Sequence, residues 1–202
     1  MVVRRRSRTP RAGIGSGIRI CAINGSSRVD GQTARRLTVI LKDAENLGAH
    51  TRLIHLARAR LAPCDGSETP RLRRDFRGIV DALSEADGII FGTPTYWFNM
   101  SGLMKNFLDR LTVMERHWTL NYKVAGFVAT GHPKEDGAMI ALSSLAVTVN
   151  GLGMVVPPYA LLYFRGSGSA WARSDWRKYA SWMIDMVNLV RHRSRVGRRK
   201  GP

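Results

Sequence analysis

Polar side chains that could bind a phosphate follow the first apolar run of the sequence. Residues 24–34 read Asn-Gly-Ser-Ser-Arg-Val-Asp-Gly-Gln-Thr-Ala and include the hydroxyls of Ser26, Ser27 and Thr33. The stretch leads into a predicted helix, which Asp30 or Thr33 could cap, and the backbone N–H groups of a first helical turn can bind an anion. The stretch is neither a Walker A loop nor a G-x-G-x-x-G sequence. We expect a site for a phosphate monoester, the alternative being an ordinary turn that caps the helix.

Three consecutive aromatic residues stand in a second candidate segment. Residues 92–102 begin with Gly-Thr-Pro and contain Tyr96, Trp97 and Phe98. Because loops lie at the protein surface, these rings cannot all enter a core. Flat side chains beside backbone N–H groups suit a large aromatic heterocycle that is stacked on one side and hydrogen-bonded at its edge. The alternative is that the rings fill space under the loop or form a subunit interface.

A third, shorter segment consists of Thr130, Gly131 and His132. Glycine allows close approach of a ligand to the backbone. A single histidine after a strand is more often a loop residue than a catalyst. We therefore expect His132 to be a contact residue and not a base.

Alternating strand and helix patterns position these segments. Apolar runs predict five short strands, at 18–23, 51–56, 88–92, 124–130 and 154–156. Helical spacing of apolar residues predicts helices between them and a last helix from Ser174 to Val190. This alternation predicts a parallel sheet covered on both faces. Ligands bind such sheets beyond the carboxyl ends of the strands, where all three candidate segments lie.

Composition limits the remaining possibilities. The 202 residues, 44% of them apolar, suit one domain at 18–190 between a disordered basic tail at 1–17 and a second basic tail at 191–202. Two cysteines are too few for a disulfide scaffold or a four-cysteine cluster. No apolar run approaches the roughly 20 residues of a membrane span, and no apolar segment follows the arginines at 4–6 as in an export signal. We expect a cytoplasmic protein.

The net charge of +17 lies mostly at the two ends. Residues 1–17 contain five arginines, and 191–202 contain five arginines and Lys200, with no acidic residue in either range. Such ends contact polyanions loosely, whereas dedicated nucleic-acid binders interleave charge with aromatic residues on a folded face. We expect no nucleic-acid partner beyond non-specific contacts of the tails.

The three segments together resemble the NAD(P)H-dependent FMN reductase family of the flavodoxin-like superfamily. The resemblance rests on 24–33, 92–110 and 130–132, and it extends over about 18–190. The second block is the most specific, because it follows the family's G-[ST]-P-x-Y and S-G-x-[LM]-K-x-[FAW]-[LI]-D-[RW] pattern nearly throughout. The resemblance implies an α/β, flavodoxin-like three-layer sandwich with a five-stranded parallel sheet in the order 2-1-3-4-5 and helices on both faces.

The resemblance also implies a cofactor, a reaction and a set of binding residues. FMN would accept a hydride from NADH or NADPH and pass it by a ping-pong mechanism to a small acceptor, which is a flavin, a quinone, or a nitro or azo compound. No catalytic side chain and no metal is expected, since the flavin carries the hydride. The FMN phosphate would be bound by Ser26, Arg28, Gln32, Thr33 and Ala34. The ribityl chain and ring edge would contact Pro94, Thr95, Tyr96, Trp97, Phe98 and Asn99, and the pocket would be completed by Thr130 and Gly131.

Some relatives also carry an iron–sulfur cluster on closely spaced cysteines, and many are dimers. Here only Cys64 stands in the corresponding region, while Cys21 lies in the first strand, so no cluster is expected. A homodimer or homotetramer is expected. One alternative is an FMN electron carrier like the flavodoxins, although those are typically acidic. Another is a flavin-free binding module that acts through the tails, which would have little need for the phosphate loop.

Overall fold

The computed structural model describes residues 15–66, 74–115, 117–131, 137–165 and 170–198. Within these ranges five parallel strands are arranged in the order β2-β1-β3-β5-β6, and a short strand β4 pairs antiparallel with the end of β3. The strands are β1 (Arg19–Asn24), β2 (His50–His55), β3 (Gly88–Tyr96), β4 (Asn99–Met100), β5 (Val124–Gly131) and β6 (Leu161–Arg165). The predicted flavodoxin-like sheet is confirmed, with the β3–β4 hairpin as an addition.

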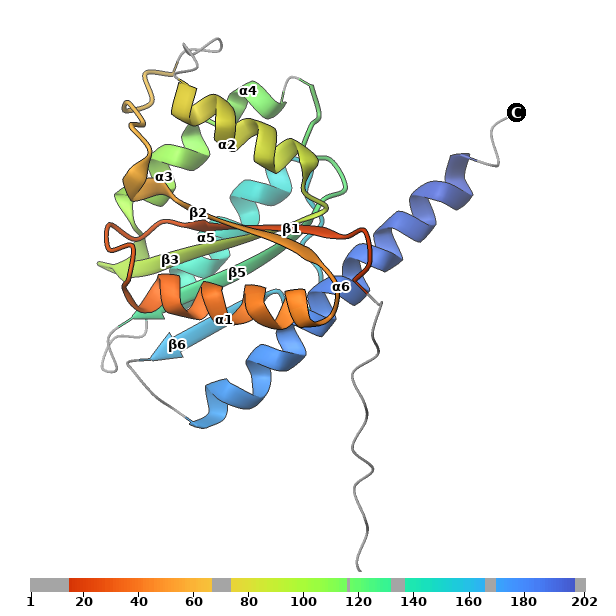
Figure 1. Cartoon of the computed structure of the whole chain (residues 1–202). Coiled ribbons are helices and arrows are strands. Elements are labelled where there is room, and N and C mark those ends of the chain that lie inside the picture. The colour runs from red at the N-terminus through yellow and green to blue at the C-terminus, as the bar shows by residue number, and fades with distance from the viewer. Residues whose placement is uncertain (1–14, 67–73, 116, 132–136, 166–169, 199–202) are drawn as a thin grey trace, which may run out of the picture.

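Helices cover both faces of the sheet (Figure 1). One face carries α1 (Gln32–Asn46) and α6 (Ala170–Arg198), and the other carries α2 (Arg74–Glu85), α3 (Gly102–Asp109), α4 (Thr112–Glu115) and α5 (Ala138–Gly151). A 3₁₀ turn, η1 (Leu56–Arg58), follows β2. The central strands are buried on both faces, which explains their nearly continuous apolar sequences. Among the described residues no helix is both long and apolar enough to cross a membrane.

The fifth parallel strand lies further along the chain than the sequence pattern indicated. The predicted strand at 154–156 forms one isolated bridge, between Val155 and Val124, and β6 begins only at Leu161. Pro157 and Pro158 stand between the two segments, and proline has no N–H to donate to the ladder. The prolines therefore interrupt the edge of the sheet, and the longer apolar run after them forms the strand.

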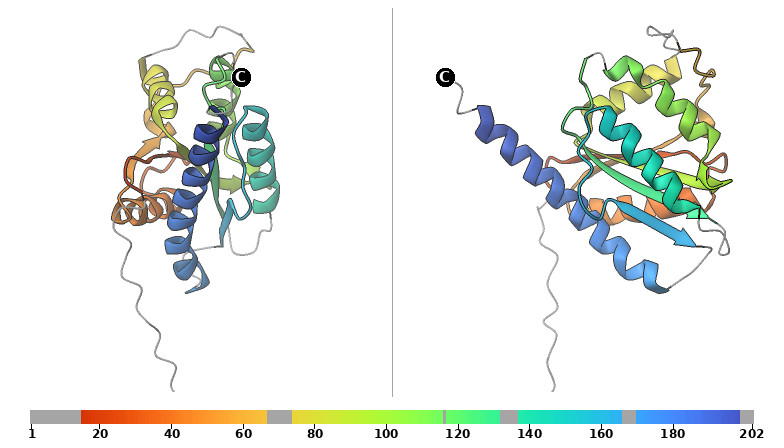
Figure 2. Two further views of the ribbon diagram at one scale, coloured as in Figure 1. Left: turned by 90° about the vertical axis from the view of Figure 1, so that its right-hand side faces the viewer. Right: turned by 180° about the vertical axis from the view of Figure 1, so that it is seen from behind.

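The last helix is also longer than expected. It starts at Ala170, four residues before the predicted start at Ser174, and it continues to Arg198. Tyr179, Met183 and Val187 are buried against the sheet, while the C-terminal part of the helix extends past the sheet (Figure 2). The division into a domain at 18–190 and two basic tails stays a prediction.

Candidate functional site

The segments that follow β1, β3 and β5 meet at one edge of the sheet. Their parallel register places Asn24 beside Gly92 and Pro94 beside Thr130, and Gly25 N donates to Gly92 O at 2.7 Å. The helices after β1 and β3 lie on opposite faces of the sheet. This divergence creates the switch point at which sheets of this type bind their ligands.

The first of these segments ends at a helix with unused backbone donors. The N-cap residue is Gly31, which has no side chain to accept a hydrogen bond from the first turn of α1. That turn also contains no acidic residue. The positive end of the helix dipole is therefore not compensated by a cap. Ser26 is buried, and its Oγ accepts from Arg28 N at 3.1 Å, which holds the loop in a tight turn. Together with the exposed side chains of Arg28 and Gln32, these groups suit an anion such as a phosphate.

Two threonines connect the start of α1 to the end of β5. Thr33 Oγ1 lies 2.7 Å from Thr130 Oγ1, and both side chains are buried. The pair carries two hydroxyl protons and uses one of them internally, so one O–H remains to donate to a ligand. The small side chain of Ala34 is buried next along the helix. The sequence predicted the two threonines as separate ligands, and the structure shows that their hydroxyls form one linked group.

The aromatic segment forms a two-residue hairpin. Trp97 and Phe98 connect β3 to β4 with φ angles of 47° and 66°, which is the left-handed region that bulky residues rarely adopt. Trp97 is 92% exposed, and Tyr96 and Phe98 are about half exposed. A Cβ atom added at Gly137, just before α5, would overlap the backbone of Phe98, so this glycine lets the hairpin pack closely. The expected loop is thus a tight turn that presents aromatic rings to solvent.

A buried hydroxyl without a partner lies beside this hairpin. Thr95 Oγ1 has no hydrogen-bond partner although its residue is only 7% exposed. A Cβ atom added at Gly131 would lie 3.4 Å from that oxygen and 3.1 Å from the Tyr163 hydroxyl. Since buried polar groups in native proteins are almost always paired, Thr95 fits a position that awaits a polar ligand.

The structure brings the predicted site residues to this one edge, and their contact with FMN stays a prediction. The buried ones are Ser26, Thr33, Ala34, Thr95 and Thr130. Pro94 and Gly131 are partly buried, and the exposed ones are Arg28, Gln32, Tyr96, Trp97, Phe98 and Asn99. His132 lies outside the described residues.

Ser101 connects the first two segments, a role that its sequence context did not show. Its Oγ donates to Gly25 O at 2.6 Å and accepts from Met104 N at 3.1 Å. Its backbone N–H donates to Thr93 Oγ1 at 2.9 Å. The capping role follows from the position of Ser101 just before α3, whereas its contact with a residue 76 positions away leaves no local signal in the sequence.

The two cysteines lie in different environments. Burial raises the pKa of Cys21 to about 12, so its thiol stays protonated and unreactive. Cys64 is exposed, its N–H donates to Asn106 Oδ1 at 2.8 Å, and its thiol donates to Asp109 O at 3.6 Å. In the described part of the chain no three His, Cys, Asp or Glu side chains gather as metal ligands would.

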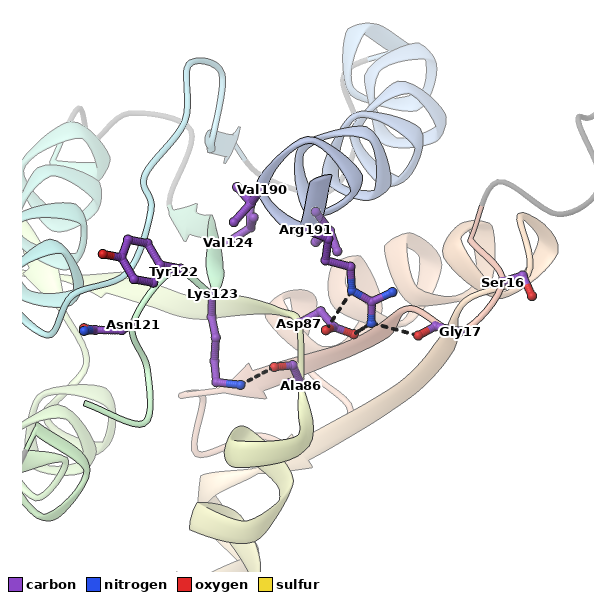
Figure 3. A pocket seen from close by; sticks show the side chains of 11 residues that line it. Ser16, Gly17, Ala86, Asp87, Asn121, Tyr122, Lys123, Val124, Val190 and Arg191 are labelled. Carbon is purple, nitrogen blue, oxygen red and sulfur yellow. Dashed lines mark hydrogen bonds and ion pairs between the residues drawn. The ribbon is translucent and has the colours of Figure 1, made fainter. Parts of the chain in front are cut away.

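A cavity of about 670 Å³ lies at the opposite, amino-terminal edge of the sheet (Figure 3). Asp87 there accepts from the Arg191 guanidinium, at 3.1 Å from Nε and 2.5 Å from Nη2, and from Arg19 N at 2.8 Å. Lys123 donates to Ala86 O at 2.5 Å and so caps the end of α2. These charged groups hold α6 and α2 against the sheet, which indicates a structural role for this edge.

Comparison with known proteins shows which family the chain resembles. Residues 18–168 match the family model of NADPH-dependent FMN reductases. The chain is 31% identical over 144 residues to an iron-sulfur flavoprotein of Archaeoglobus fulgidus, a match that covers 68% of this chain and 71% of that protein. It is 31% identical over 126 residues to an iron-sulfur flavoprotein of Methanocaldococcus jannaschii, covering 59% of this chain and 65% of that one.

Solved structures show the same fold. An NADH:FMN oxidoreductase in its apo form is 26% identical with a TM-score of 0.63, and the match covers 86% of this chain and 88% of that chain. A flavoenzyme NAD(P)H:(acceptor) oxidoreductase from Paracoccus denitrificans is 18% identical with a TM-score of 0.70, covering 85% and 98%. The order of the sheet and the helices on its two faces define a flavodoxin-like fold. Within that class, the chain belongs to the NADPH-dependent FMN reductase family.

Proposed function

We propose that the protein is an FMN-dependent oxidoreductase that transfers a hydride from NADH or NADPH to a small acceptor, such as a flavin, a quinone, or a nitro or azo compound, by a ping-pong mechanism. Bound FMN would supply the hydride chemistry, and the protein would supply binding and orientation. The observation that carries the proposal is the convergence of an uncapped helix N-terminus, buried hydroxyls and the unpartnered Thr95 hydroxyl at the switch point. The family membership of the chain supports it.

The phosphate end of the site is formed by the first segment and the threonine pair. The N–H groups at the start of α1 and the remaining O–H of Thr33 and Thr130 would donate to phosphate oxygens. Arg28 and Gln32 would add charged and amide donors from the solvent side. Backbone donors on a rigid helix hold a phosphate in one place without a change of side-chain conformation.

The ring end of the site is formed by the aromatic hairpin. Thr95 Oγ1 has an unused O–H for the polar edge of a heterocycle. Asn99 Oδ1 accepts from Met100 N at 2.8 Å, which leaves the NH₂ group of Asn99 to donate. Trp97 would offer a flat apolar surface to a nicotinamide or an aromatic acceptor. In a ping-pong mechanism both substrates use one open face in turn, and the high exposure of Trp97 is consistent with such a face.

A carboxylate in the phosphate loop tests this assignment. In the Ser26→Asp variant the side chain can still accept from Arg28 N, so the turn is kept, but its charge repels a phosphate. We expect FMN affinity to fall at least about tenfold, from a repulsion of about 1.4 kcal/mol or more, while riboflavin affinity is unchanged. Ser84→Asp, an exposed site at the opposite edge, is the control. Unchanged FMN affinity in Ser26→Asp would contradict the location of the phosphate.

We also propose that the protein is a homodimer that associates through α5. This helix contains no charged residue, although the chain carries +17. Met139, Ile140 and Val147 are 56 to 74% exposed on its outer face, with Ser143 and Ser144 between them along a shallow groove. A strongly basic protein can bind its own copy most easily through an uncharged surface. Around a twofold axis at the serines, Ile140 of one copy would pack against Val147 of the other.

A further inference from the structure

A series of hydrogen bonds leads from the end of β2 into the phosphate loop. Asn24 and His55 are paired in register at the ends of β1 and β2, and Asn24 Nδ2 lies 2.9 Å from His55 Nδ1. Asn24 Oδ1 accepts from Ser26 N at 3.1 Å, and Ser26 Oγ accepts from Arg28 N at 3.1 Å. The imidazole of His55 is thus connected through Asn24 to the loop that precedes α1.

The backbone determines the protonation state of His55 in this arrangement. The N–H of Ser26 requires an acceptor, so it fixes the Asn24 amide with Oδ1 toward the loop. The NH₂ group of Asn24 then faces His55, and Nδ1 of the ring must accept the hydrogen bond. His55 is therefore neutral here, with its proton on Nε2. Asn24 is fully buried, so water cannot replace either partner at low cost.

We infer that His55 is a positioning residue for the phosphate loop: its neutral imidazole holds Asn24, and through Asn24 the turn at Ser26, in the conformation that binds phosphate. The identity of the ligand rests on the proposed function, whereas the hydrogen-bond series does not. His55 stands on an edge strand outside the three segments predicted from the sequence, so no pattern in those segments indicated it.

Protonation of His55 would break this connection. A second N–H on the ring would oppose the NH₂ group of Asn24, and a flip of the amide would remove the acceptor from Ser26 N. Burial, and then the positive charge of Arg58 on η1, lower the pKa of His55 below its ordinary value of about 6.5. Arg28 and Asp30 are the charged residues of the adjacent loop. The affinity for FMN should therefore be highest above the pKa of His55 and decrease as the pH falls through that pKa.

Replacement of the acceptor nitrogen provides the test. FMN affinity is measured by quenching of flavin fluorescence between pH 5 and pH 8 for the full chain, His55→Leu and His55→Asn. His55→Leu should bind FMN about threefold to tenfold more weakly at neutral pH, because one hydrogen bond is lost. His55→Asn places a non-titrating oxygen near the position of Nδ1 and should restore affinity. The ratio of wild-type affinity to that of His55→Asn should fall toward pH 5, which separates His55 from the titration of the FMN phosphate itself.

The control is His50→Leu, an exposed histidine at the other end of β2, which should bind as the wild type does. Wild-type affinity of His55→Leu at every pH would overturn the inference. If the unmodified chain binds no FMN, the proposed function fails, and ¹⁵N NMR decides the inference separately. A ring protonated at Nε2 and a Ser26 amide signal that titrates with His55 would support it. A ring protonated at Nδ1, or a Ser26 amide that does not respond, would overturn it.

Discussion

At the residue scale, Trp97 and Phe98 occupy a turn that glycine and asparagine adopt far more easily. Two consecutive positive φ angles are required by a two-residue hairpin of this kind. A left-handed conformation costs a non-glycine residue about 1 kcal/mol or more, and such costs concentrate at functional sites. Trp97 gains little packing in return, since it is 92% exposed. The exposed ring is therefore free to contact a ligand, and its role is tested by substitution.

Trp97→Asn should therefore separate stability from activity. The substitution relieves backbone strain and should raise the free energy of unfolding by about 1 kcal/mol. Loss of the aromatic surface should lower kcat/KM with aromatic acceptors about tenfold, from roughly 1.4 kcal/mol of stacking. Trp118 is the matched control, because it has a φ of 50° and is 64% exposed but precedes β5 at the opposite edge.

Urea denaturation and steady-state kinetics on both variants check this prediction. Trp118→Asn should gain similar stability with unchanged kinetics. Full activity of Trp97→Asn would show that the exposed ring takes no part in catalysis.

At the element scale, the order of strands and helices could be predicted because most strands are short apolar runs and apolar residues at helical spacing follow them. The position of β6 could not be predicted. Val155 already pairs with Val124 of β5 at this edge of the sheet, and Pro157 and Pro158 then interrupt the pairing. The β3–β4 hairpin was missed because two aromatic residues are an unusual turn sequence. The spacing of apolar residues therefore predicts helices and strands well, but it does not predict where a strand is interrupted or reversed.

The location of the candidate site could be predicted for a related reason. Parallel strands bring their carboxyl ends to one edge, so polar residues just after each strand must meet. The contacts that hold the segments together, Thr33 with Thr130 and Ser101 with Gly25, join residues 97 and 76 positions apart. Asn24 and His55 are likewise distant in the sequence and meet only in the folded sheet. Such pairs depend on strand register, which the sequence of one strand does not reveal.

The attachment of α6 gives a second prediction at this scale. Arg191 binds Asp87 with two nitrogens and also donates to Gly17 O at 2.9 Å. Arg191→Leu should lower the free energy of unfolding by about 1 kcal/mol, since both side chains are partly exposed and their attraction is screened. Arg77→Leu, an exposed arginine on α2, should change it by less than about 0.5 kcal/mol. Thermal unfolding at low and high salt checks the pair, and equal effects of the two variants would argue against this attachment.

At the scale of the whole molecule, the uncharged face of α5 is unusual in a protein with 32 lysine and arginine residues and 15 acidic ones. Val147→Glu would place a like charge from each copy near the proposed twofold axis, and should convert a dimer into a monomer. Val39→Glu, at an exposed valine on α1, adds the same charge elsewhere and should leave the dimer intact. Light scattering after gel filtration distinguishes the outcomes. A wild-type monomer, or a Val147→Glu dimer, would refute this interface.

The central claim is that the carboxyl edge of this sheet binds FMN and receives electrons from a nicotinamide. The most direct measurement is an anaerobic absorbance spectrum of the purified full chain with FMN, recorded before and after addition of NADH or NADPH. The account predicts that bound flavin bleaches directly to the two-electron reduced form and that a quinone or a flavin then restores its absorbance. Flavin that binds but is reduced by neither nicotinamide would contradict the reductase function and favour an electron carrier. A chain that binds no flavin would contradict the site itself.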